Sequence, residues 1–290
     1  MGLGLEGVTF LLYARKQGVN YTRTATLGRQ QLLVSNRSLR KVLREFGHTV
    51  DREAVRQLTD GGFADGLLEL LGAEVVHSFD FSDYQGATVL HDFNEPLEGK
   101  FLSGYTAVID GGTLEHIFDF RTAITNCMGM LEPGGSFLSL SPANNYLGHG
   151  FYQFSPELLF RTLGPCNGFR IRESILVEHR LRPRWWSVKD PEAAGMRVIQ
   201  VNSVPTEFFV LAQRVQPGEL LLKTPQQSDY DRTWKADDAG PAGTGFAGRL
   251  RSVLGPLLPP HVKIFLGTIW LRYFSSPRLR PNQFKRLRPR

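Results

Sequence analysis

The clearest pattern of apolar and polar positions lies between residues 105 and 140. A run of apolar residues at 107–109 stops at Asp110-Gly111-Gly112, which predicts a buried strand that ends in a polar loop. Apolar residues then recur at helical spacing over 114–128. Pro133 cannot continue this helix, and the apolar residues at 136–140 predict a second short strand.

A strand, a helix and a second strand in this order are typical of a mostly parallel α/β sheet. In such sheets ligands bind outside the carboxyl ends of the strands. Polar residues follow both strands, at 110–112 and at 144–145. The sequence therefore predicts a doubly wound α/β fold with a binding site at this edge of the sheet.

The same reading of the pattern places other elements along the chain. Residues 8–14 are apolar and fit either a strand or a short helix, and residues 21–27 alternate. The other predicted helices cover 36–46, 51–58, 66–71 and 156–163, and the other predicted strands cover 74–79, 87–90, 169–178 and 205–214.

Two further segments stand out in the sequence, a glycine motif near the N-terminus and an insertion that contains tryptophans. Gly2, Gly4 and Gly7 match G-x-G-x-x-G, but a nucleotide fingerprint needs a preceding strand, so we treat the match as chance. Residues 180–202 look like an insertion that contains Trp185 and Trp186, which we interpret as a lid or an oligomer contact.

Charge and composition divide the 290 residues into three parts. Residues 215–290 hold 13 Lys and Arg against 5 Asp and Glu, whereas residues 1–214 have a net charge of −2. We predict an α/β domain over 1–214, a linker over 215–245 and a basic extension over 246–290. The slightly acidic main domain argues against a nucleic-acid partner.

The basic extension leaves two interpretations open. It combines apolar segments at 246–258 and 262–274, predicted as short helices, with a basic tail. This combination suits peripheral contact with an anionic membrane surface, and it also suits a helix docked on the main domain with a disordered tail, which we favour. The sequence does not fix the oligomeric state.

The cysteines and the N-terminal residues bear on the compartment. Cys127 and Cys166 indicate neither a disulfide framework nor a metal cluster, and we expect no bound metal. We see no signal-peptide pattern and no uncharged run approaching the roughly 18–20 residues of a membrane span. We expect a cytoplasmic protein, peripheral to the inner face of the membrane if the basic tail binds lipid.

Residues 110–116 together with Leu131-Glu132-Pro133-Gly134-Gly135 resemble class I S-adenosylmethionine-dependent methyltransferases. Many members of this superfamily have a Leu-Glu-His loop after strand four and Leu-x-Pro-Gly-Gly before strand five. The resemblance covers about 75–214 and is nearest to a type-11-like branch with a divergent glycine-rich motif. It implies a Rossmann-like fold, S-adenosylmethionine as cofactor, and a closing antiparallel pair formed by 169–178 and 205–214.

The resemblance also implies which residues bind the cofactor. Asp80 follows strand two, where an acidic residue accepts hydrogen bonds from both ribose hydroxyls, and Asp83 is a nearby alternative. Asp92 and Phe93 follow strand three, where they would meet the adenine ring, although Phe93 suits the core equally well. The short link at 81–86 leaves little room for the usual helix between these strands.

The cofactor loop after strand one departs from the family. Only Gly28 stands where spaced glycines belong, with Arg29 or Gln30 as sources of polar contacts, and a plain surface turn is the alternative. The loop at Asp110-Gly111-Gly112 completes the cofactor site that the resemblance implies.

Polar and aromatic residues after the second strand predict an acceptor pocket. The segment 144–154 is dense in amides, aromatics and glycine, and the alternative is a loop that plugs the sheet edge. His116 and His149 are candidate catalytic bases, although a structural role would also explain His116. The candidate substrate-binding residues are Glu115, Asn144, Asn145, Tyr152 and Gln153.

These inferences favour methyl transfer from S-adenosylmethionine to a small-molecule or glycan acceptor. The alternative is a catalytically silent methyltransferase-like binding module, which the basic tail would hold at a membrane surface. A nicotinamide-dependent oxidoreductase would need a glycine-rich turn before a helix, which this sequence lacks.

Overall fold

The structure is a computed structural model that describes residues 2–217, 220–221, 224–238, 259, 262, 265, 269 and 280–289. It divides into two compact units. The first comprises Met1–Ser187, Val204–Pro225 and Arg286–Arg290, and the second comprises Val188–Ser203 and Gln226–Lys285.

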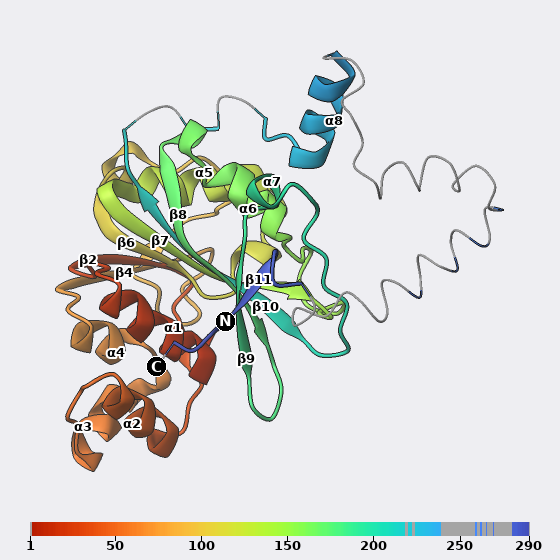
Figure 1. Cartoon of the computed structure of the whole chain (residues 1–290). Coiled ribbons are helices and arrows are strands. Elements are labelled where there is room, and N and C mark those ends of the chain that lie inside the picture. The colour runs from red at the N-terminus through yellow and green to blue at the C-terminus, as the bar shows by residue number, and fades with distance from the viewer. Residues whose placement is uncertain are drawn as a thin grey trace. The chain divides into compact units, whose positions relative to one another are not determined.

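The central sheet lies in the first unit except for parts of two strands. Its strands are β2 (Arg23–Leu27), β4 (Val75–Asp80), β5 (Val89–Leu90), β6 (Tyr105–Asp110), β7 (Leu131–Asn144), β8 (Phe169–Glu178), β9 (Arg184–Val188), β10 (Thr206–Arg214) and β11 (Phe284–Leu287). The end of β9 and the start of β11 belong to the second unit. Within the described residues these nine strands follow the order β11-β9-β8-β10-β7-β6-β2-β4-β5 (Figure 1).

The strands β5, β4, β2, β6 and β7 all pair in parallel. The chain enters this part of the sheet at β2, moves outward to β4 and β5, and then returns to place β6 and β7 on the other side of β2. The point where this direction reverses lies between β2 and β6, where Leu27 is level with Asp110. The predicted doubly wound, mostly parallel sheet is therefore confirmed.

Strands β10, β8 and β9 pair antiparallel with their neighbours. β10 pairs with β7 on one side and with β8 on the other, as the closing antiparallel pair was predicted to do. β9 then pairs with β8. Trp185 and Trp186 on β9 are 6% and 5% exposed, and Trp185 packs edge-on against Phe209. Both tryptophans therefore belong to the sheet and its core rather than to a lid.

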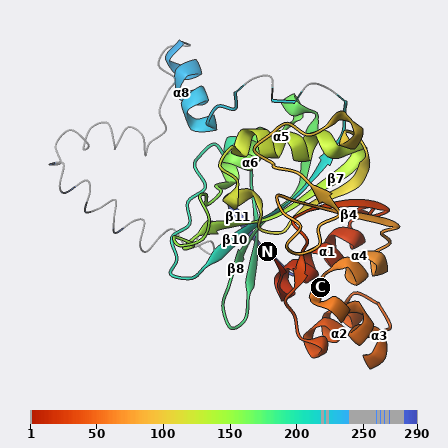
Figure 2. The ribbon, with the colours of Figure 1, turned by 180° about the vertical axis from the view of Figure 1, so that it is seen from behind.

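Helices cover both faces of the sheet (Figures 1 and 2). The helices on one face are α1 (Leu5–Lys16), α2 (Asn36–Glu45), α3 (Arg52–Leu58) and α4 (Asp65–Leu70), and those on the other are α5 (Phe120–Met130) and α6 (Pro156–Thr162). Ala107 and Ile109 of β6 pack in one core cluster with α1, because alternate residues of a strand point to the same face.

Side-chain caps explain where several helices begin. Ser35, Asp119 and Ser155 each accept a hydrogen bond from a backbone N–H in the first turn of α2, α5 and α6. Pro156 occupies the first turn of α6, where its missing N–H costs nothing. The remaining short elements are β1 (Gly2–Leu3), β3 (Gln31–Leu32), η1 (Asp60–Gly62), η2 (Gly99–Phe101), η3 (Leu114–His116) and η4 (Pro165–Asn167).

Two elements differ from the pattern around residues 105–140. The helix predicted from residue 114 is broken, because Ile117 is extended and separates η3 from α5. The strand predicted over 136–140 is longer, since β7 continues through Pro142 to Asn144. Its parallel ladder with β6 ends at Ser139, so Pro142 faces only β10 and its missing N–H interrupts no ladder on the β6 side.

The link between β4 and β5 contains turns and bends but no helix, as its short length predicted. Strand β5 has only two residues, fewer than the four that were predicted. This flank of the sheet is therefore abbreviated.

The second unit contains α7 (Pro191–Ala194) and α8 (Ser228–Asp238). Arg197 bonds Asp229 at 2.5 Å and lies over the ring of Tyr230, while Gln283 donates to the Arg197 carbonyl at 2.9 Å. Helix α8 falls within the predicted linker at 215–245. The boundaries of the predicted linker and basic extension stay predictions.

Most of the basic extension lies outside the described residues, including the whole predicted helix at 246–258 and most of the one at 262–274. None of the helices in the described part of the chain is both long and apolar enough to cross a membrane. The contact with a membrane surface stays a prediction.

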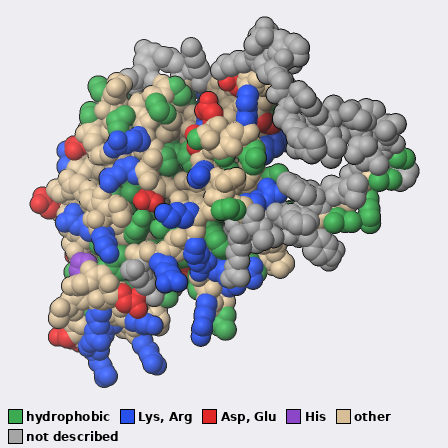
Figure 3. Space-filling view, viewed as in Figure 1, with side chains coloured by type: hydrophobic (Ala, Val, Ile, Leu, Met, Phe, Trp, Pro, Cys, Tyr) green, Lys and Arg blue, Asp and Glu red, His purple; other side chains and the backbone are tan. Residues whose placement is uncertain are grey.

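Basic side chains also gather elsewhere, over α2 and α3 (Figure 3). They border a shallow groove together with Asn36, Glu45 and Val55. The basic members of this groove are Arg37, Arg40, Lys41, Arg44, Arg52 and Arg56. The apolar residues of the same helices, among them Leu39 and Leu43, are fully buried, so the predicted amphipathic α2 is confirmed.

Candidate active site

A cavity of about 590 Å³, here called the first cavity, opens at the carboxyl ends of β2 and β4. This is the place where a doubly wound sheet binds its ligands. Its volume lies within the range of pockets that hold small molecules. The lining residues are Gly28, Phe79, Asp80, Phe81, His91, Asp92, Phe93, Asn94, Thr113, His116 and Ile117.

Carboxylates stand at the ends of two neighbouring strands of the first cavity. Asp80 ends β4, and its carbonyl accepts a hydrogen bond from the His91 N–H at 2.8 Å, which ties the end of β4 to the segment after β5. Asp92 Oδ1 accepts bonds from the backbone and side-chain amides of Asn94. These bonds lower the pKa of Asp92, so it carries a negative charge at neutral pH.

Aromatic side chains form the apolar wall of the same cavity. Phe93 is 5% exposed and packs edge-on against Phe79 and His91, so the core and the cavity share this residue. His91 was not predicted as a site residue. Among the described residues its buried Nε2 has no hydrogen-bond partner.

The loop after β2 closes one end of the first cavity. Gly28 has a φ of 68° and donates its N–H to the Phe79 carbonyl at 2.6 Å. A left-handed conformation of this kind favours glycine, which explains the single glycine in this loop. Arg29 turns away to Asp65, at 3.4 Å, and stacks over Phe63.

Gln30 packs against the next loop. Its Nε2 donates to the Leu27 carbonyl at 2.5 Å, and its Oε1 would lie 2.2 Å from a Cβ placed on Gly111. Only glycine fits at residue 111 as long as the Gln30 side chain keeps its present conformation. Gln30 therefore supports the β6 loop rather than lining the first cavity.

Asp110 lines neither this cavity nor the one described next. Its Oδ1 accepts from the backbone of Thr113 and Leu114, and its Oδ2 accepts from the hydroxyls of Ser139 and Ser141. Complete burial raises the pKa of Asp110, and these four bonds oppose that rise. In the structure Asp110 shapes the loop.

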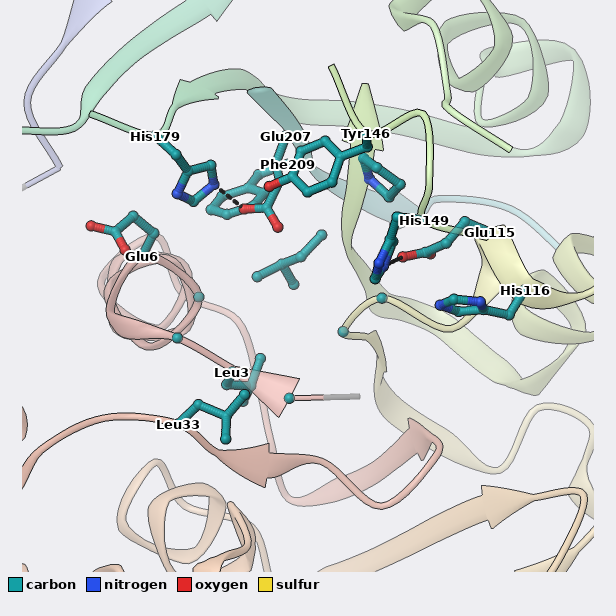
Figure 4. Close-up of a pocket in the computed structure, with 17 residues that line it drawn as sticks. Leu3, Glu6, Leu33, Glu115, His116, Tyr146, His149, His179, Glu207 and Phe209 are labelled. Atoms are coloured by element: carbon teal, nitrogen blue, oxygen red, sulfur yellow. Dashed lines mark hydrogen bonds and ion pairs between the residues drawn. The ribbon is translucent and has the colours of Figure 1, made fainter. Parts of the chain in front are cut away.

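A second cavity of about 350 Å³ lies beside the first (Figure 4). Gly111 and Gly112, which were predicted to bind the cofactor, line this second cavity and not the first. Glu115, His116 and His149, which were predicted to bind or activate the acceptor, line it with them. The other lining residues are Gly2, Leu3, Gly4, Glu6, Gly7, Leu33, Leu140, Pro142, Tyr146, His179, Glu207 and Phe209. His116 lines both cavities, so it stands where they meet.

The first imidazole–carboxyl pair of the second cavity joins His149 Nε2 and Glu115 Oε1 at 3.3 Å (Figure 4). Glu115 is 1% exposed. Burial, followed by the nearby Asp110, raises the pKa of Glu115 to about 8. Burial and the neighbouring His149 lower the pKa of His116, which is therefore neutral at pH 7.

The second pair, His179 and Glu207, lies on the opposite side of the cavity, with Tyr146 between the pairs (Figure 4). His179 Nε2 and Glu207 Oε2 are 2.6 Å apart, and this hydrogen bond raises the pKa of His179 against the opposing effect of burial. Burial likewise raises the pKa of Tyr146. His179 and Glu207 were not predicted, because β8 and β10 meet only in the folded sheet, whereas Tyr146 lies in the segment 144–154 that was predicted to form an acceptor pocket.

The N-terminal glycine segment was also missed. Gly2 lies on β1 and Gly4 precedes α1, so the G-x-G-x-x-G match is not a nucleotide loop after a strand of the main sheet. The segment nevertheless forms one wall of the second cavity. Its three closely spaced glycines were the only signal in the sequence.

Four predicted substrate-binding residues line neither cavity. Asn145 Nδ2 donates to the Val204 carbonyl, Tyr152 OH donates to the Phe118 carbonyl, and Gln153 Oε1 accepts from the Tyr146 N–H. Asn144 ends β7 and pairs with Thr206. These contacts hold the loop that carries His149.

Comparisons with known proteins leave the family open. No family model matches the chain, and no curated protein matches it. An S-adenosylmethionine-dependent methyltransferase of Mesorhizobium loti aligns at 14% identity and a TM-score of 0.42, over 73% of this chain and 100% of that one.

Two further solved structures align at similar values. One is 1,6-didemethyltoxoflavin-N1-methyltransferase of Burkholderia thailandensis with bound 1,6-didemethyltoxoflavin and S-adenosylhomocysteine, at 14% identity, a TM-score of 0.40, and 73% and 78% coverage of this chain and that chain. The other is described as putative Zn-dependent alcohol dehydrogenases from Rhodobacter sphaeroides, at 10% identity, 0.39, and 73% and 90% coverage. At these values the likenesses do not decide an activity.

Proposed function

We propose that this protein binds S-adenosylmethionine in the first cavity and transfers its methyl group to a small-molecule acceptor in the second. The observation that carries the proposal is the placement of Asp80 and Asp92. Both residues line one cavity at the ends of adjacent strands, at the sheet edge where a doubly wound fold binds ligands.

The chemistry of the first cavity fits a nucleoside. A carboxylate at Asp80 offers two oxygens to the vicinal hydroxyls of a ribose. Asp92 and the unpartnered Nε2 of His91 offer polar contacts to the edge of a base, and Phe93 offers an apolar surface. S-adenosylmethionine would supply a methyl group on a sulfonium, which is already a strong electrophile.

The residues of this chain would then orient the acceptor and manage its proton. Because His116 lines both cavities, an acceptor beside it would lie next to the cofactor. The neutral imidazole of His116 can accept a proton from a hydroxyl acceptor, and His149, which is held by Glu115, is the second candidate base. A glycan acceptor would have to place a single sugar unit in the second cavity, which has a volume of about 350 Å³.

Calorimetric titration of the full chain with S-adenosylmethionine and S-adenosylhomocysteine tests cofactor binding. We expect one site and a thermal shift with both compounds. The absence of heat and of any shift with either compound would rule out the proposal. Binding without methyl transfer to any member of a panel of hydroxyl, amine and glycan acceptors would favour the silent binding module instead.

A further inference from the structure

Two imidazoles and one carboxyl group come together on the wall of the second cavity. One ligand-type atom from each of Glu115, His116 and His149 lies within 4.8 Å of the other two. The rings of His116 and His149 are 4.9 Å apart, centroid to centroid. Figure 4 shows the three side chains side by side at one end of the cavity.

The backbone holds this cluster in place. The N–H groups of Phe151 and Tyr152 both donate to the carbonyl of Glu115, at 2.7 and 3.3 Å. Gly150 has a φ of 71°, and a Cβ there would lie 2.7 Å from the same carbonyl. The loop that carries His149 is therefore fastened to η3, which carries the other two residues, and the donors need little reorganisation to act together.

One atom of the cluster lacks a partner. Glu115 Oε2 is buried and has no hydrogen-bond partner among the described residues, although the residue is 1% exposed. Leaving a polar atom in this state is unfavourable, and buried carboxylates are normally paired with a cation or bound to a metal. Described Lys and Arg side chains do not line this cavity, so the structure offers no cationic side chain there.

We propose that Glu115, His116 and His149 bind one divalent transition-metal cation on the wall of the second cavity. Two histidines and one carboxylate form a donor set that first-row cations such as Zn²⁺, Co²⁺, Mn²⁺ and Fe²⁺ accept and that leaves positions open for a further ligand. Imidazole donors disfavour Mg²⁺ and Ca²⁺, which prefer oxygen. The sequence alone led us to expect no metal.

The distances fit such a cation. Bonds of about 2.1 Å to a tetrahedral ion place two donor atoms roughly 3.4 Å apart. The separation of Glu115 Oε1 and His149 Nε2 is 3.3 Å. No two of the three donor atoms are more than 4.8 Å apart, so the third donor has to approach the other two by about 1.4 Å at most to reach the spacing of a bound ion.

The cation has a clear use if the proposed methyl transfer is correct, and this step rests on that proposal. With the cation bound, His116 and His149 are ligands and no longer accept the proton of the acceptor. An acceptor hydroxyl at an open coordination position instead loses its proton to water more readily, because a bound cation lowers the pKa of an attached oxygen. That oxygen then forms the new bond to the methyl group while the carbon–sulfur bond breaks. Cation binding itself does not depend on methyl transfer.

The test is a titration of the untagged full chain with Co²⁺, followed by absorbance, and with Zn²⁺ in competition with a chromophoric chelator. We expect one site per chain. Glu115→Gln and His149→Ala should each weaken binding by at least about 10–100-fold, the loss that disturbing even outer-shell partners of a metal causes.

His179→Gln is the matched control, because it removes an imidazole from the same cavity without touching the cluster. We expect its affinity for Co²⁺ to stay within about twofold of the wild type. His149 has a half-exposed side chain, so His149→Ala should fold even if Glu115→Gln does not, and melting temperatures check both.

Two results would overturn the cation site. One is wild-type binding no tighter than about 1 mM, the level of weak surface association. The other is an equal loss of affinity in His149→Ala and His179→Gln. S-adenosylhomocysteine titrations of the same samples keep this result separate from the methyl-transfer proposal, because the first cavity can bind its ligand whether or not the cation site exists.

Discussion

The two cavities share one wall at His116, yet the chain builds them in different ways. The first cavity draws mainly on the segments that directly follow β2, β4, β5 and β6. The second joins an N-terminal segment, η3, a loop after β7, a residue that follows β8 and residues of β10, which lie far apart in the sequence. Local patterns can thus locate a site at the ends of parallel strands, whereas they reveal only part of a site between distant segments, here the residues that follow β6 and His149.

The largest expected effect concerns the first cavity. Asp80→Ala should reduce the affinity for S-adenosylhomocysteine by about 1–3 kcal/mol, because a buried ligand would lose a hydrogen bond to a charged group. Isothermal titration calorimetry measures the change. Asp83→Ala is the control, since Asp83 is exposed and does not line the cavity. If Asp83→Ala loses more affinity than Asp80→Ala, Asp83 contacts the ribose and the assignment of this contact to Asp80 is wrong.

Gly111, which lines the second cavity, can be used to test the packing between the loops that follow β2 and β6. Gly111→Ala should lower the free energy of unfolding by about 1–3 kcal/mol, because the new Cβ would overlap the Gln30 side chain. Urea denaturation of Gly111→Ala, Gln30→Ala and the double variant measures their coupling. If the overlap is the cause, Gly111→Ala costs less in the Gln30→Ala background, and equal costs in both backgrounds would exclude it.

A smaller effect is expected for the loop of the second cavity. Tyr152→Phe removes the 2.6 Å hydrogen bond to the Phe118 carbonyl and should lower the free energy of unfolding by about 0.5–1.5 kcal/mol. Because Tyr152 lines neither cavity, the affinity for S-adenosylhomocysteine should not change. A selective loss of that affinity, with unchanged stability, would place the hydroxyl in contact with a ligand.

The smallest effect is a dependence of stability on pH from the second pair. The Glu207 hydrogen bond raises the pKa of His179 above its ordinary 6.5, so the folded state binds this proton more tightly than the unfolded state. The resulting stabilisation, about 1 kcal/mol or less for a partly exposed pair, is fully present below pH 6.5 and is lost as the pH rises through the folded-state pKa. Urea denaturation of wild type and His179→Gln between pH 5.5 and roughly 9 should show curves that converge at high pH. A constant difference across this range would show that His179 contributes by packing alone.

The part of the fold that the sequence predicted is the part with strong local patterns. Strands β4, β6, β8 and β10 follow from apolar runs, and α2, α3 and α6 follow from apolar spacing and caps. The length of β7 could not be predicted, because Pro142 is tolerated only where the ladder with β6 has ended. The break between η3 and α5 was hidden because its residues keep a helical spacing of apolar positions.

The candidate site divides in the same way. Asp80, Asp92 and Phe93 were recognisable at the ends of strands, and they line the first cavity. Asp110 was equally recognisable, but its side chain accepts a hydrogen bond from Ser139 and lines neither cavity. This orientation depends on Ser139 of the neighbouring strand β7, so the residues around Asp110 do not reveal it. His179 and Glu207 meet across β8 and β10, so only the register of that pair reveals them.

The short strand β5 has a consequence for how copies of this protein behave at high concentration. It ends the parallel side of the sheet with only two residues, and Leu90 on it is 60% exposed. A sheet border of this length offers few unpaired backbone groups to a second chain, so it is a poor template for intermolecular β-structure. A mutation that extended pairing along residues 81–88 would lengthen that template beside an exposed leucine and make aggregation from this border more favourable.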